Sequence, residues 1–314
     1  MADVKVVNLG CPKNLVDAEI IMGYINKYIS ENYDSLKENR QKIVIINTCA
    51  FLSSAISESF DTIKKYLNEK KAGFVDKVFV SGCLVQRLKD EIRLHVPQID
   101  GLIGQDALPL VGKIIFEDEK SRVVENPRYL PSFNTPRIIT SGYFSYLKIG
   151  EGCSRTCSFC TIPSIRGTFR KRTVDDILQE AKKLLESGVR EIILVAQDLT
   201  LYGKELIQLF EKMRRLDDTY WLRTLYLHPD GISRNPDIIK SMKDNNFLPY
   251  FEVPIQHINE RILKRMNRKG GKASILQALE IIEKYFDECA IRTEVIVGFP
   301  GEGEKEFKEL CEFV

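Results

Sequence analysis

The apolar positions of the first 120 residues alternate between strand-like runs and helix-like stripes. Short apolar runs predict three strands, at residues 4–9, 42–47 and 76–81. A stripe with helical spacing follows each run, at residues 15–29, about 52–67 and 84–95. Asn14 is the predicted cap of the first helix. Strands and helices in alternation predict an α/β fold with a parallel sheet covered by helices.

A second series of strand and helix patterns begins near residue 144. Strands are predicted at residues 144–149, 191–196, 222–228, 250–255 and 291–298. The best marked helix has Thr173 as its cap, an apolar stripe from Val174 to Leu185, and Gly188 at its end. Successive βα units predict a partial (β/α) barrel with its functional site at the carboxyl ends of the strands.

The periodicity breaks between the two series, where Pro127, Pro131 and Pro136 stand among charged and small residues. We therefore expect an N-terminal α/β domain at 1–120, a linker at 121–141 and an incomplete barrel domain at 142–314. The chain stops within a helix pattern, GEGEKEFKELCEFV, that has no cap or tail. We expect the C-terminus to be truncated.

Composition narrows the class of protein only in part. The 314 residues are 44% hydrophobic, enough for two ordinary cores. A net charge of +2 argues neither for nor against a nucleic-acid partner. There is no secretory signal and no apolar run of membrane length, so we expect a cytoplasmic protein without membrane contact. In such a compartment the eight cysteines are metal ligands or free thiols more readily than disulfides.

Three cysteines stand close together in YLKIGEGCSRTCSFCTIPSIRG, residues 146–167. Cys153, Cys157 and Cys160 have CxxxCxxC spacing. Three thiolates at this spacing can hold three irons of a 4Fe-4S cluster, because sulfur ligands suit iron. The fourth iron is left open for a substrate or cofactor. A zinc site is the alternative, but zinc usually takes four Cys or His ligands, and His95 and His228 lie far off in sequence.

Three further cysteines follow the predicted N-terminal strands. Cys11, Cys49 and Cys83 each stand directly after a strand and before a helix. Because the carboxyl ends of parallel strands meet at one edge of an open sheet, we expect these cysteines to meet there. Each alone could be a small buried hydrophobe, but three equivalent positions predict a second metal cluster. Cys289 and Cys311 have no such partners, and we interpret them as structural.

The triplet, with Phe159 directly before its last cysteine, resembles the signature of radical S-adenosylmethionine (SAM) enzymes. The resemblance implies that the triplet binds a 4Fe-4S cluster, that Phe159 packs near it, and that SAM chelates the open iron through its amino and carboxylate groups. One electron then cleaves the sulfonium to methionine and a 5'-deoxyadenosyl radical. The protein positions and shields the cofactors.

The same resemblance assigns roles to residues at other strand ends. Gln197, Gln256 and Gly298 follow three predicted strands, and in radical SAM barrels such positions contact the cofactor. Ordinary loop roles are the alternative. His257 could carry a proton, although a lone histidine is more often a hydrogen-bonded structural residue. We therefore assign no catalytic residue beyond this weak candidate.

With two tri-cysteine sets, the whole chain resembles the methylthiotransferases. The resemblance implies that the barrel cluster generates the radical that abstracts a substrate hydrogen, that the N-terminal cluster supplies sulfur, and that a second SAM donates the methyl group. The product is a methylthio group inserted into an unactivated C–H bond. An electron donor such as flavodoxin or ferredoxin is expected as a partner.

The substrate depends on a few residues near Cys11 and Cys49. The string LGCPKNLVDAE, residues 9–19, resembles the RimO-type branch, which modifies the β-carbon of an aspartate in small-subunit ribosomal protein S12. Phe51 and the following SSAISES favour the same branch. Ala50 departs from it, since alanine there is common in the tRNA enzymes of MiaB/MtaB type. Ribosomal protein S12 or the small ribosomal subunit is thus the expected substrate, with tRNA as the runner-up.

Members of this family usually continue into a final strand and a small C-terminal TRAM-like β-barrel domain, which this chain lacks. We therefore expect it to recognise its macromolecular substrate poorly. Two basic stretches stand after the triplet and after the fourth barrel strand: Arg166, Arg170, Lys171 and Arg172, then Arg261, Lys264, Arg265, Arg268, Lys269 and Lys272. They could hold an anionic substrate, or form solvated helix faces.

Two other classes of protein stay open. One is an iron-sulfur electron carrier or scaffold that has two clusters and no radical chemistry. The other is an RNA-binding module stabilised by zinc. Metal analysis of protein purified without oxygen would separate them, because about eight irons and no stoichiometric zinc would exclude the second.

Overall fold

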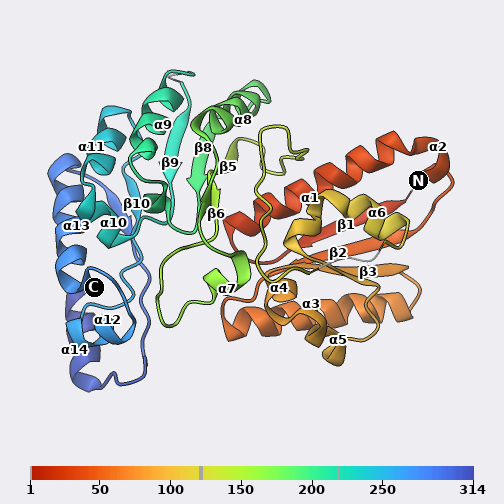
Figure 1. Ribbon diagram of the computed structural model, residues 1–314, viewed down its shortest axis with the longest axis horizontal. Helices are drawn as coiled ribbons and strands as arrows, with labels where there is room; N and C mark the ends of the chain where they lie inside the picture. Colours follow the sequence, from red (N-terminus) through yellow and green to blue (C-terminus); the bar gives the residue numbers. More distant parts are fainter. Residues whose placement is uncertain (1, 120–122, 218) are drawn as a thin grey trace. The chain divides into compact units, whose positions relative to one another are not determined.

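A computed structural model describes residues 2–119, 123–217 and 219–314 of the protein. The chain divides into two compact units, and Figure 1 labels many of their helices and strands. Met1–Thr140 and Ser164–Gly167 form the first unit, and Ser141–Pro163 and Thr168–Val314 form the second. In the described part of the chain, no helix is both long and apolar enough to cross a membrane.

The first unit is built on a parallel sheet of four strands in the order β1-β2-β3-β4. The strands are β1 (Asp3–Asn8), β2 (Lys42–Thr48), β3 (Lys77–Gly82) and β4 (Gly101–Ile103). Every residue of β2 after Lys42 is buried, as expected for an inner strand covered on both faces. The three predicted strands are confirmed. The sequence analysis missed β4, because three residues are too few to show a period.

Helices cover both faces of this sheet (Figure 1). They are α1 (Pro12–Glu31), α2 (Tyr33–Leu36), α3 (Ser53–Lys71), α4 (Cys83–Leu88), η1 (Lys89–Glu91), α5 (Ile92–His95), η2 (Gln105–Leu110) and α6 (Val111–Phe116). On the α3 face, Val44 and Ile46 of β2 belong to one buried cluster with Ile63 and Leu67. The predicted helix at 84–95 is wrong in one respect. It is broken into three short segments, and Lys89 adopts a left-handed φ of 51° at the break.

The predicted cap of the first helix is also wrong. The helix α1 begins at Pro12, and Cys11 occupies the position before it. Proline is well suited to the first turn, where its missing N–H would have had no partner inside the helix. Asn14 therefore lies within the first turn, where it is fully buried.

The described part of the second unit contains parallel strands in two groups, as expected for a partial (β/α) barrel. They are β5 (Phe144–Lys148), β8 (Glu191–Val195), β9 (Trp221–Thr224), β10 (Tyr250–Glu252) and β11 (Ala290–Arg292). One sheet has the order β5-β8-β9, and β10 pairs with β11. The N–H of Leu227, just beyond β9, donates to Glu252 O of β10 at 2.9 Å and links the two.

The other elements of this unit are a short hairpin and the helices that follow the strands. The hairpin pairs β6 (Gly150–Glu151) with β7 (Arg170–Lys171). The helices are α7 (Ile162–Arg166), which continues into the first unit, α8 (Val174–Glu186), η3 (Leu199–Tyr202), α9 (Glu205–Arg214), α10 (Pro229–Arg234), α11 (Asp237–Asp244), α12 (Glu260–Arg265), α13 (Gly271–Tyr285) and α14 (Glu304–Phe313). The predicted cap is confirmed, since Thr173 Oγ1 accepts the Asp176 N–H at 3.3 Å.

Several barrel strands are shorter than predicted. The apolar runs at 222–228 and 250–255 extend beyond β9 and β10, which end at Thr224 and Glu252. Left-handed backbone interrupts the ladder soon afterwards, at Tyr226 (φ 65°) and Gln256 (φ 70°). Such conformations are rare for residues with a side chain and are concentrated at functional sites. The irregular segments after the strands are therefore the place to look for a site.

Candidate metal centres

The sheet of the first unit brings its three cysteines to one edge. In the register of β2 and β3, Thr48 pairs with Gly82, so the next residues, Cys49 and Cys83, are neighbours. In the register of β1 and β2, Asn8 pairs with Asn47, and Cys11 follows shortly after β1. We expected these cysteines to meet because the ends of parallel strands lie at one edge. The three strands are parallel in the structure, as this expectation requires.

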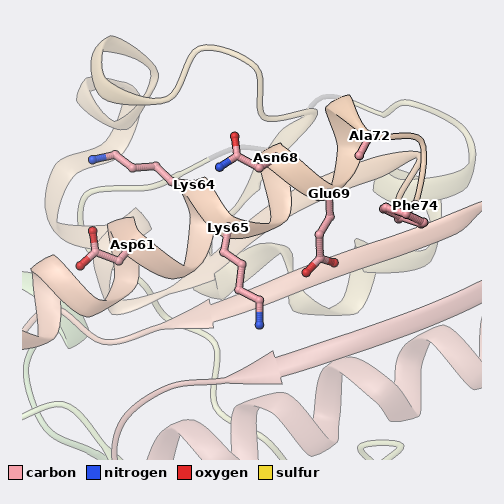
Figure 2. Close-up of a pocket in the computed structure, with 7 residues that line it drawn as sticks. All are labelled: Asp61, Lys64, Lys65, Asn68, Glu69, Ala72 and Phe74. Atoms are coloured by element: carbon pink, nitrogen blue, oxygen red, sulfur yellow. The ribbon is translucent and has the colours of Figure 1, made fainter.

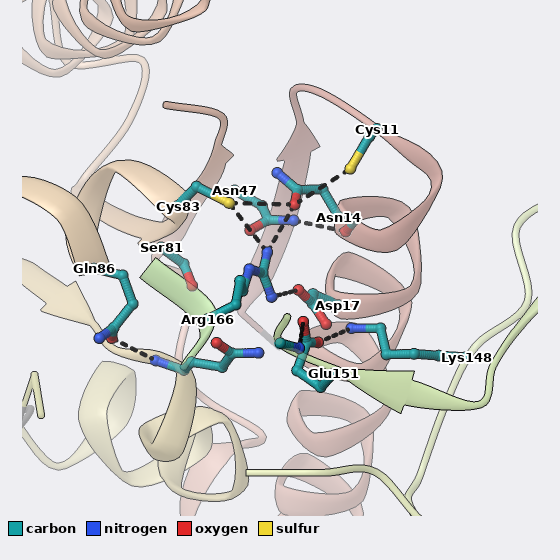
Figure 3. A network of polar contacts seen from close by, with 12 residues as sticks. Cys11, Asn14, Asp17, Asn47, Ser81, Cys83, Gln86, Lys148, Glu151 and Arg166 are labelled. Carbon is teal, nitrogen blue, oxygen red and sulfur yellow. Dashed lines mark hydrogen bonds and ion pairs between the residues drawn. The ribbon is translucent and has the colours of Figure 1, made fainter. Parts of the chain in front are cut away.

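Asn14 connects two cysteines of this edge, Cys11 and Cys83 (Figure 3). Its Nδ2 donates to Leu9 O at 3.0 Å and to Thr48 O at 2.9 Å, which ties the ends of two strands together. Its Oδ1 lies 3.9 Å from Cys11 Sγ and 3.6 Å from Cys83 Sγ, within reach of a thiol donor. The side chain that was predicted to cap a helix thus organises the thiol set.

Two glycines let the strand ends approach so closely. A Cβ on Gly82 would lie 2.5 Å from Thr48 O, and one on Gly10 would lie 2.9 Å from Cys49 Cβ. Both residues also have left-handed φ values, 90° and 103°. A larger residue in place of Gly82 would push Cys49 and Cys83 apart. A larger residue in place of Gly10 would push Cys49 away from the start of α1.

A buried arginine joins the same group. Arg166 Nη2 donates to Cys83 Sγ at 3.2 Å and to Asn14 Oδ1 at 2.8 Å, while Nη1 lies 2.7 Å from Asp17 Oδ2 (Figure 3). The residue is 3% exposed. The sequence analysis offered Arg166 and Arg172 as contacts for an anionic substrate, and this is wrong for both. Arg172 is equally buried and is bonded to Asp176 and Glu180.

The surroundings act on these thiols in opposite directions. Burial raises the pKa of the Cys83 thiol above its usual value; Arg166 opposes the shift, and Cys11 and Cys49 add to it. Burial would likewise raise the pKa of Cys11, but Lys13, Arg166 and nearby N–H groups lower it overall. Charge on one sulfur thus acts on another, as it must where thiols share one site.

The triplet loop of the second unit is fastened at several points. Arg155 Nε lies 2.5 Å from Asp198 Oδ2, and its Nη1 lies 2.9 Å from Asp230 Oδ2. Ser158 donates through its N–H to Met266 O, and Asn267 Nδ2 donates to Thr156 O at 2.8 Å. The segments that follow β8, β9 and α12 therefore fix the loop. The sequence analysis missed the role of Arg155, and no short motif signals it.

Donors are directed at the sulfurs of the triplet. The Arg155 N–H donates to Cys153 Sγ at 3.4 Å, and Arg268 Nη1 lies 3.5 Å from Cys157 Sγ. Burial raises the pKa of Cys153 to about 11 and that of Cys160 in the same direction. Cys160 contributes to the shift at Cys153, and Cys157 to the shift at Cys160, so the three thiols act on one another.

A buried ion pair supports the hairpin that leads into the triplet. Lys148 Nζ lies 2.8 Å from Glu151 Oε2, and both side chains are at most 1% exposed. Glu151 Oε1 also accepts from Gln197 Nε2 at the end of β8. Gln197 Oε1 is buried and has no hydrogen-bond partner among the described residues. Gln197 Oε1 can therefore accept a hydrogen bond from a bound molecule.

His228 provides a donor at the end of β9. Its Nδ1 accepts the Asp230 N–H at 3.2 Å, so the neutral ring carries its proton on Nε2. Burial, with Arg268 and Arg155, lowers the pKa of His228 well below its usual value. In the described ranges, His228 Nε2 and Arg268 Nε are buried without a hydrogen-bond partner. The sequence analysis used this histidine only to weigh a zinc site.

The other predicted site residues lie in the segments after β10 and β11. His257 is fully buried; its Nδ1 accepts the N–H groups of Ile258 and Asn259, and its Nε2 faces Glu302 Oε1 at 3.5 Å. Gln256 is held in left-handed backbone by two bonds, to Glu294 O and from Ile296 N. Gly298 has a φ of 71°, with open space where a Cβ would stand. Phe159 is partly buried in the triplet loop.

The donor sets fit iron-sulfur clusters. All six cysteines are free of disulfides. No group of three or more His, Cys, Asp or Glu residues in the described ranges is placed around a single metal ion. A 4Fe-4S cluster makes a different demand, because each thiolate binds its own iron. Three thiols at each place, with N–H or guanidinium donors directed at their sulfurs, match the ligands and outer hydrogen bonds of such a cluster.

The first unit has a small cavity beside Arg166 and a larger hollow over α3. A cavity of about 10 Å³, the space of one water molecule, adjoins Arg166, and the buried oxygens Asn47 Oδ1 and Gln105 Oε1 on its wall have no partner among the described residues. A larger hollow of about 560 Å³ lies open over α3 (Figure 2). Its walls are Asp61, Lys64, Lys65, Asn68, Glu69, Ala72 and Phe74. These include none of the predicted site residues.

Comparison with known families matches both halves of the chain. Residues 147–314 match the radical SAM superfamily. Residues 3–104 match an uncharacterized protein family, UPF0004. The two matched ranges contain the second and the first tri-cysteine sets, respectively.

Curated relatives extend the likeness to the full chain. The ribosomal protein uS12 methylthiotransferase RimO of Clostridioides difficile is 41% identical over 326 residues, which cover 100% of this chain and 72% of the relative. The protein of the same name from Caldicellulosiruptor saccharolyticus is 43% identical over 330 residues, which cover 100% of this chain and 73% of the relative.

Solved structures share the fold at low sequence identity. The radical S-adenosylmethionine methyltransferase TsrM from Kitasatospora setae has a TM-score of 0.69 and 13% identity, with 99% of this chain and 70% of that chain covered. The cobalamin-dependent S-adenosylmethionine radical enzyme OxsB has a TM-score of 0.66 and 15% identity, with 99% and 51% covered. The predicted fold class, a parallel-sheet unit followed by a partial radical SAM barrel, is confirmed.

Proposed function

This chain belongs to the radical SAM methylthiotransferases, and from that premise we propose that it inserts a methylthio group at the β-carbon of an aspartate in small-subunit ribosomal protein S12. One observation carries the proposal. Relatives named ribosomal protein uS12 methylthiotransferase RimO are 38–43% identical over 98–100% of the chain.

We assign the two 4Fe-4S clusters of such an enzyme to the two cysteine sets. Cys153, Cys157 and Cys160 would hold the cluster that binds SAM, and Cys11, Cys49 and Cys83 would hold the other. When bound, these groups would supply the radical that removes hydrogen from the substrate carbon and the sulfur that replaces it. The directed N–H and guanidinium groups support the assignment, because such donors neutralise thiolate charge in a buried site.

The chain's own residues would orient the cofactor. His228 Nε2–H and Arg268 Nε are buried donors that need an acceptor, and a carboxylate would satisfy both. We propose that they bind the carboxylate of SAM. Gln197 Oε1 is a buried acceptor suited to an ammonium group. These groups would hold the cofactor by hydrogen bonds and exclude water from its charged end.

Phe159, Gln256 and Gly298 stay proposed cofactor contacts. The open space at Gly298 supports a close approach of its backbone to a bound molecule. The left-handed backbone of Gln256 is of the kind found at functional sites. For His257, complete burial and two accepted N–H groups support a structural role over proton transfer.

One experiment tests the proposed activity and separates the substrates. The reconstituted protein is incubated without oxygen with SAM, dithionite and either ribosomal protein S12 or tRNA, and each substrate is examined by mass spectrometry. A methylthio group on an aspartate of S12 is the expected result. An adduct on tRNA alone would replace the proposed substrate. No cleavage of SAM at all would indicate an electron carrier or scaffold instead.

Two matched variants connect the result to the cysteines. Alanine at Cys153, Cys157 and Cys160 should abolish SAM cleavage. Alanine at the other three cysteines should leave SAM cleavage intact and abolish methylthio transfer. Replacing dithionite by reduced flavodoxin or ferredoxin tests the proposed electron donors.

A further inference from the structure

Arg166 is placed to act on a cluster ligand. Its Nη2 donates to Cys83 Sγ at 3.2 Å, and the guanidinium is buried. We propose that Arg166 is a positioning residue of the first metal centre: it fixes the Cys83 sulfur by a hydrogen bond and raises the reduction potential of the cluster bound there. This inference rests on the proposed assignment of a cluster to Cys11, Cys49 and Cys83.

The helix α1 clamps the guanidinium. Asn14 Oδ1 and Asp17 Oδ2 lie 2.8 Å and 2.7 Å from its two terminal nitrogens. The two residues are three apart on α1, so they present their oxygens on the same side of the helix. The planar fork of an arginine directs its donors at several acceptors in a fixed geometry, whereas the donors of a lysine ammonium are not held in one plane. The guanidinium that Asn14 and Asp17 hold in place also donates from Nη2 to the Cys83 sulfur.

Burial gives this contact its effect. Cys83 is 7% exposed and Arg166 is 3% exposed, so water screens their interaction little. Hydrogen bonds to the sulfurs and nearby charge are among the factors that set the reduction potential of an iron-sulfur cluster. Reduction adds negative charge, so a positive donor on a ligand sulfur favours the reduced state. Removing that donor should lower the potential.

The chain path makes Arg166 available to this site. Cys160 belongs to the second unit, and Ser164–Gly167 belong to the first. The segment after the triplet therefore supplies the donor for a ligand of the other cysteine set. The sequence signal is the arginine in the run IPSIRG, which we expected to hold an anionic substrate or to lie on a solvated helix face.

The experiment measures a potential rather than turnover. The full chain with alanine at Cys153, Cys157 and Cys160 keeps only the first cysteine set, and its iron is titrated by redox potentiometry with electron paramagnetic resonance. In this background, Arg166→Gln should lower the midpoint potential, and Arg166→Lys, which keeps the charge, should restore part of it. Asp17→Asn removes a negative charge and leaves the arginine, so it should raise the potential.

Arg137→Gln is the matched control. Arg137 belongs to the same unit, its side chain is 7% exposed, and its Nη2 lies 2.6 Å from Glu19 Oε2 on α1. It should destabilise the fold as Arg166→Gln does and leave the potential unchanged. Equal potentials in Arg166→Gln and Arg137→Gln would overturn the inference. If Arg166→Gln does not fold, the test is Asp17→Asn. An unchanged or lower midpoint potential in that variant would also overturn the inference.

The iron content of the parent separates the assignment of the first cluster from the role of Arg166. If the three-alanine parent holds no iron, the proposed assignment of the first cluster fails, and the role of Arg166 fails with it. If the parent holds its cluster and the potentials do not move as stated, only the role of Arg166 fails.

Discussion

Arg155 and Asp198 join the triplet loop to the end of β8, with Arg155 Nε 2.5 Å from Asp198 Oδ2. The same guanidinium reaches Asp230 Oδ2 at 2.9 Å, beyond β9. Arg155 stands two residues after Cys153, and its own N–H donates to Cys153 Sγ. The conformation of the ligand loop is thus set by two carboxylates, one beyond β8 and one in α10, which follows β9.

Arg155→Met should release this loop. Two buried carboxylates would lose the guanidinium that ties them to the loop, and we expect iron in the reconstituted protein to fall from about eight to about four per chain as the second cluster is lost. Iron analysis after gel filtration measures this. Arg234→Met is the control, because Arg234 also pairs with Asp230 but its side chain is 71% exposed. Equal iron in both variants would show that the loop holds its shape without Arg155.

Gly82→Ala should destabilise the first unit through a clash. The new Cβ would lie 2.5 Å from Thr48 O, which is backbone and cannot move aside. We expect a loss of about 3 kcal/mol in the free energy of unfolding, from urea denaturation of the apoprotein. Gly73→Ala shares the left-handed φ, 77° against 90°, but has open space at its Cβ. It should lose about 1 kcal/mol, the backbone penalty alone. Similar losses in both would refute the steric argument.

Glu151→Gln should cost more than removal of the whole ion pair. Lys148 would keep its charge in a site where it is 1% exposed, at a cost of about 3–5 kcal/mol in the free energy of unfolding. The double variant Lys148→Met/Glu151→Leu removes both charges and should be less destabilised. Chemical denaturation of the single and double variants measures the coupling. A double variant with a lower free energy of unfolding than Glu151→Gln would contradict this expectation.

Glu306 should contribute to acid sensitivity. The bond to Arg261, with the N–H groups of Gly303 and Glu306, lowers the pKa of Glu306 from 4.5 to about 2. The folded state therefore binds the proton less well than the unfolded state does. The stabilisation is fully present above pH 4.5 and is lost as the pH falls towards 2. Glu306→Gln should flatten this part of the stability curve, and Glu304→Gln should not.

His228→Phe should weaken SAM binding. It removes a buried donor that we assign to the cofactor carboxylate, and the loss of one such bond corresponds to roughly a tenfold rise in Kd. Equilibrium dialysis with the reconstituted protein measures it. His95→Phe, an exposed ring stacked edge-on against Phe60 in the first unit, serves as the control. An unchanged Kd for SAM in His228→Phe would show that His228 does not bind the SAM carboxylate.

The sequence was a reliable guide wherever spacing alone decides the outcome. The alternation of strand and helix periods placed Cys11, Cys49 and Cys83 at strand ends, because register in a parallel sheet follows from continuous buried runs such as β2. The cap at Thr173 was equally local, since a side chain and an N–H three residues apart make it. The spacing of the triplet is also local, since its three thiols lie within eight residues, Cys153–Cys160.

Only the tertiary structure decided what surrounds those sulfurs. Arg166 and Cys83 are 83 residues apart, and Arg155 and Asp198 are 43 apart, so no local pattern pairs them. The basic stretch after the triplet suggested that Arg166 and Arg172 hold an anionic substrate or form a solvated helix face, whereas both are buried beside Asp17 and Asp176. The reason is physical: a guanidinium is stable inside a protein only where the fold brings it acceptors, and those acceptors come from distant parts of the chain.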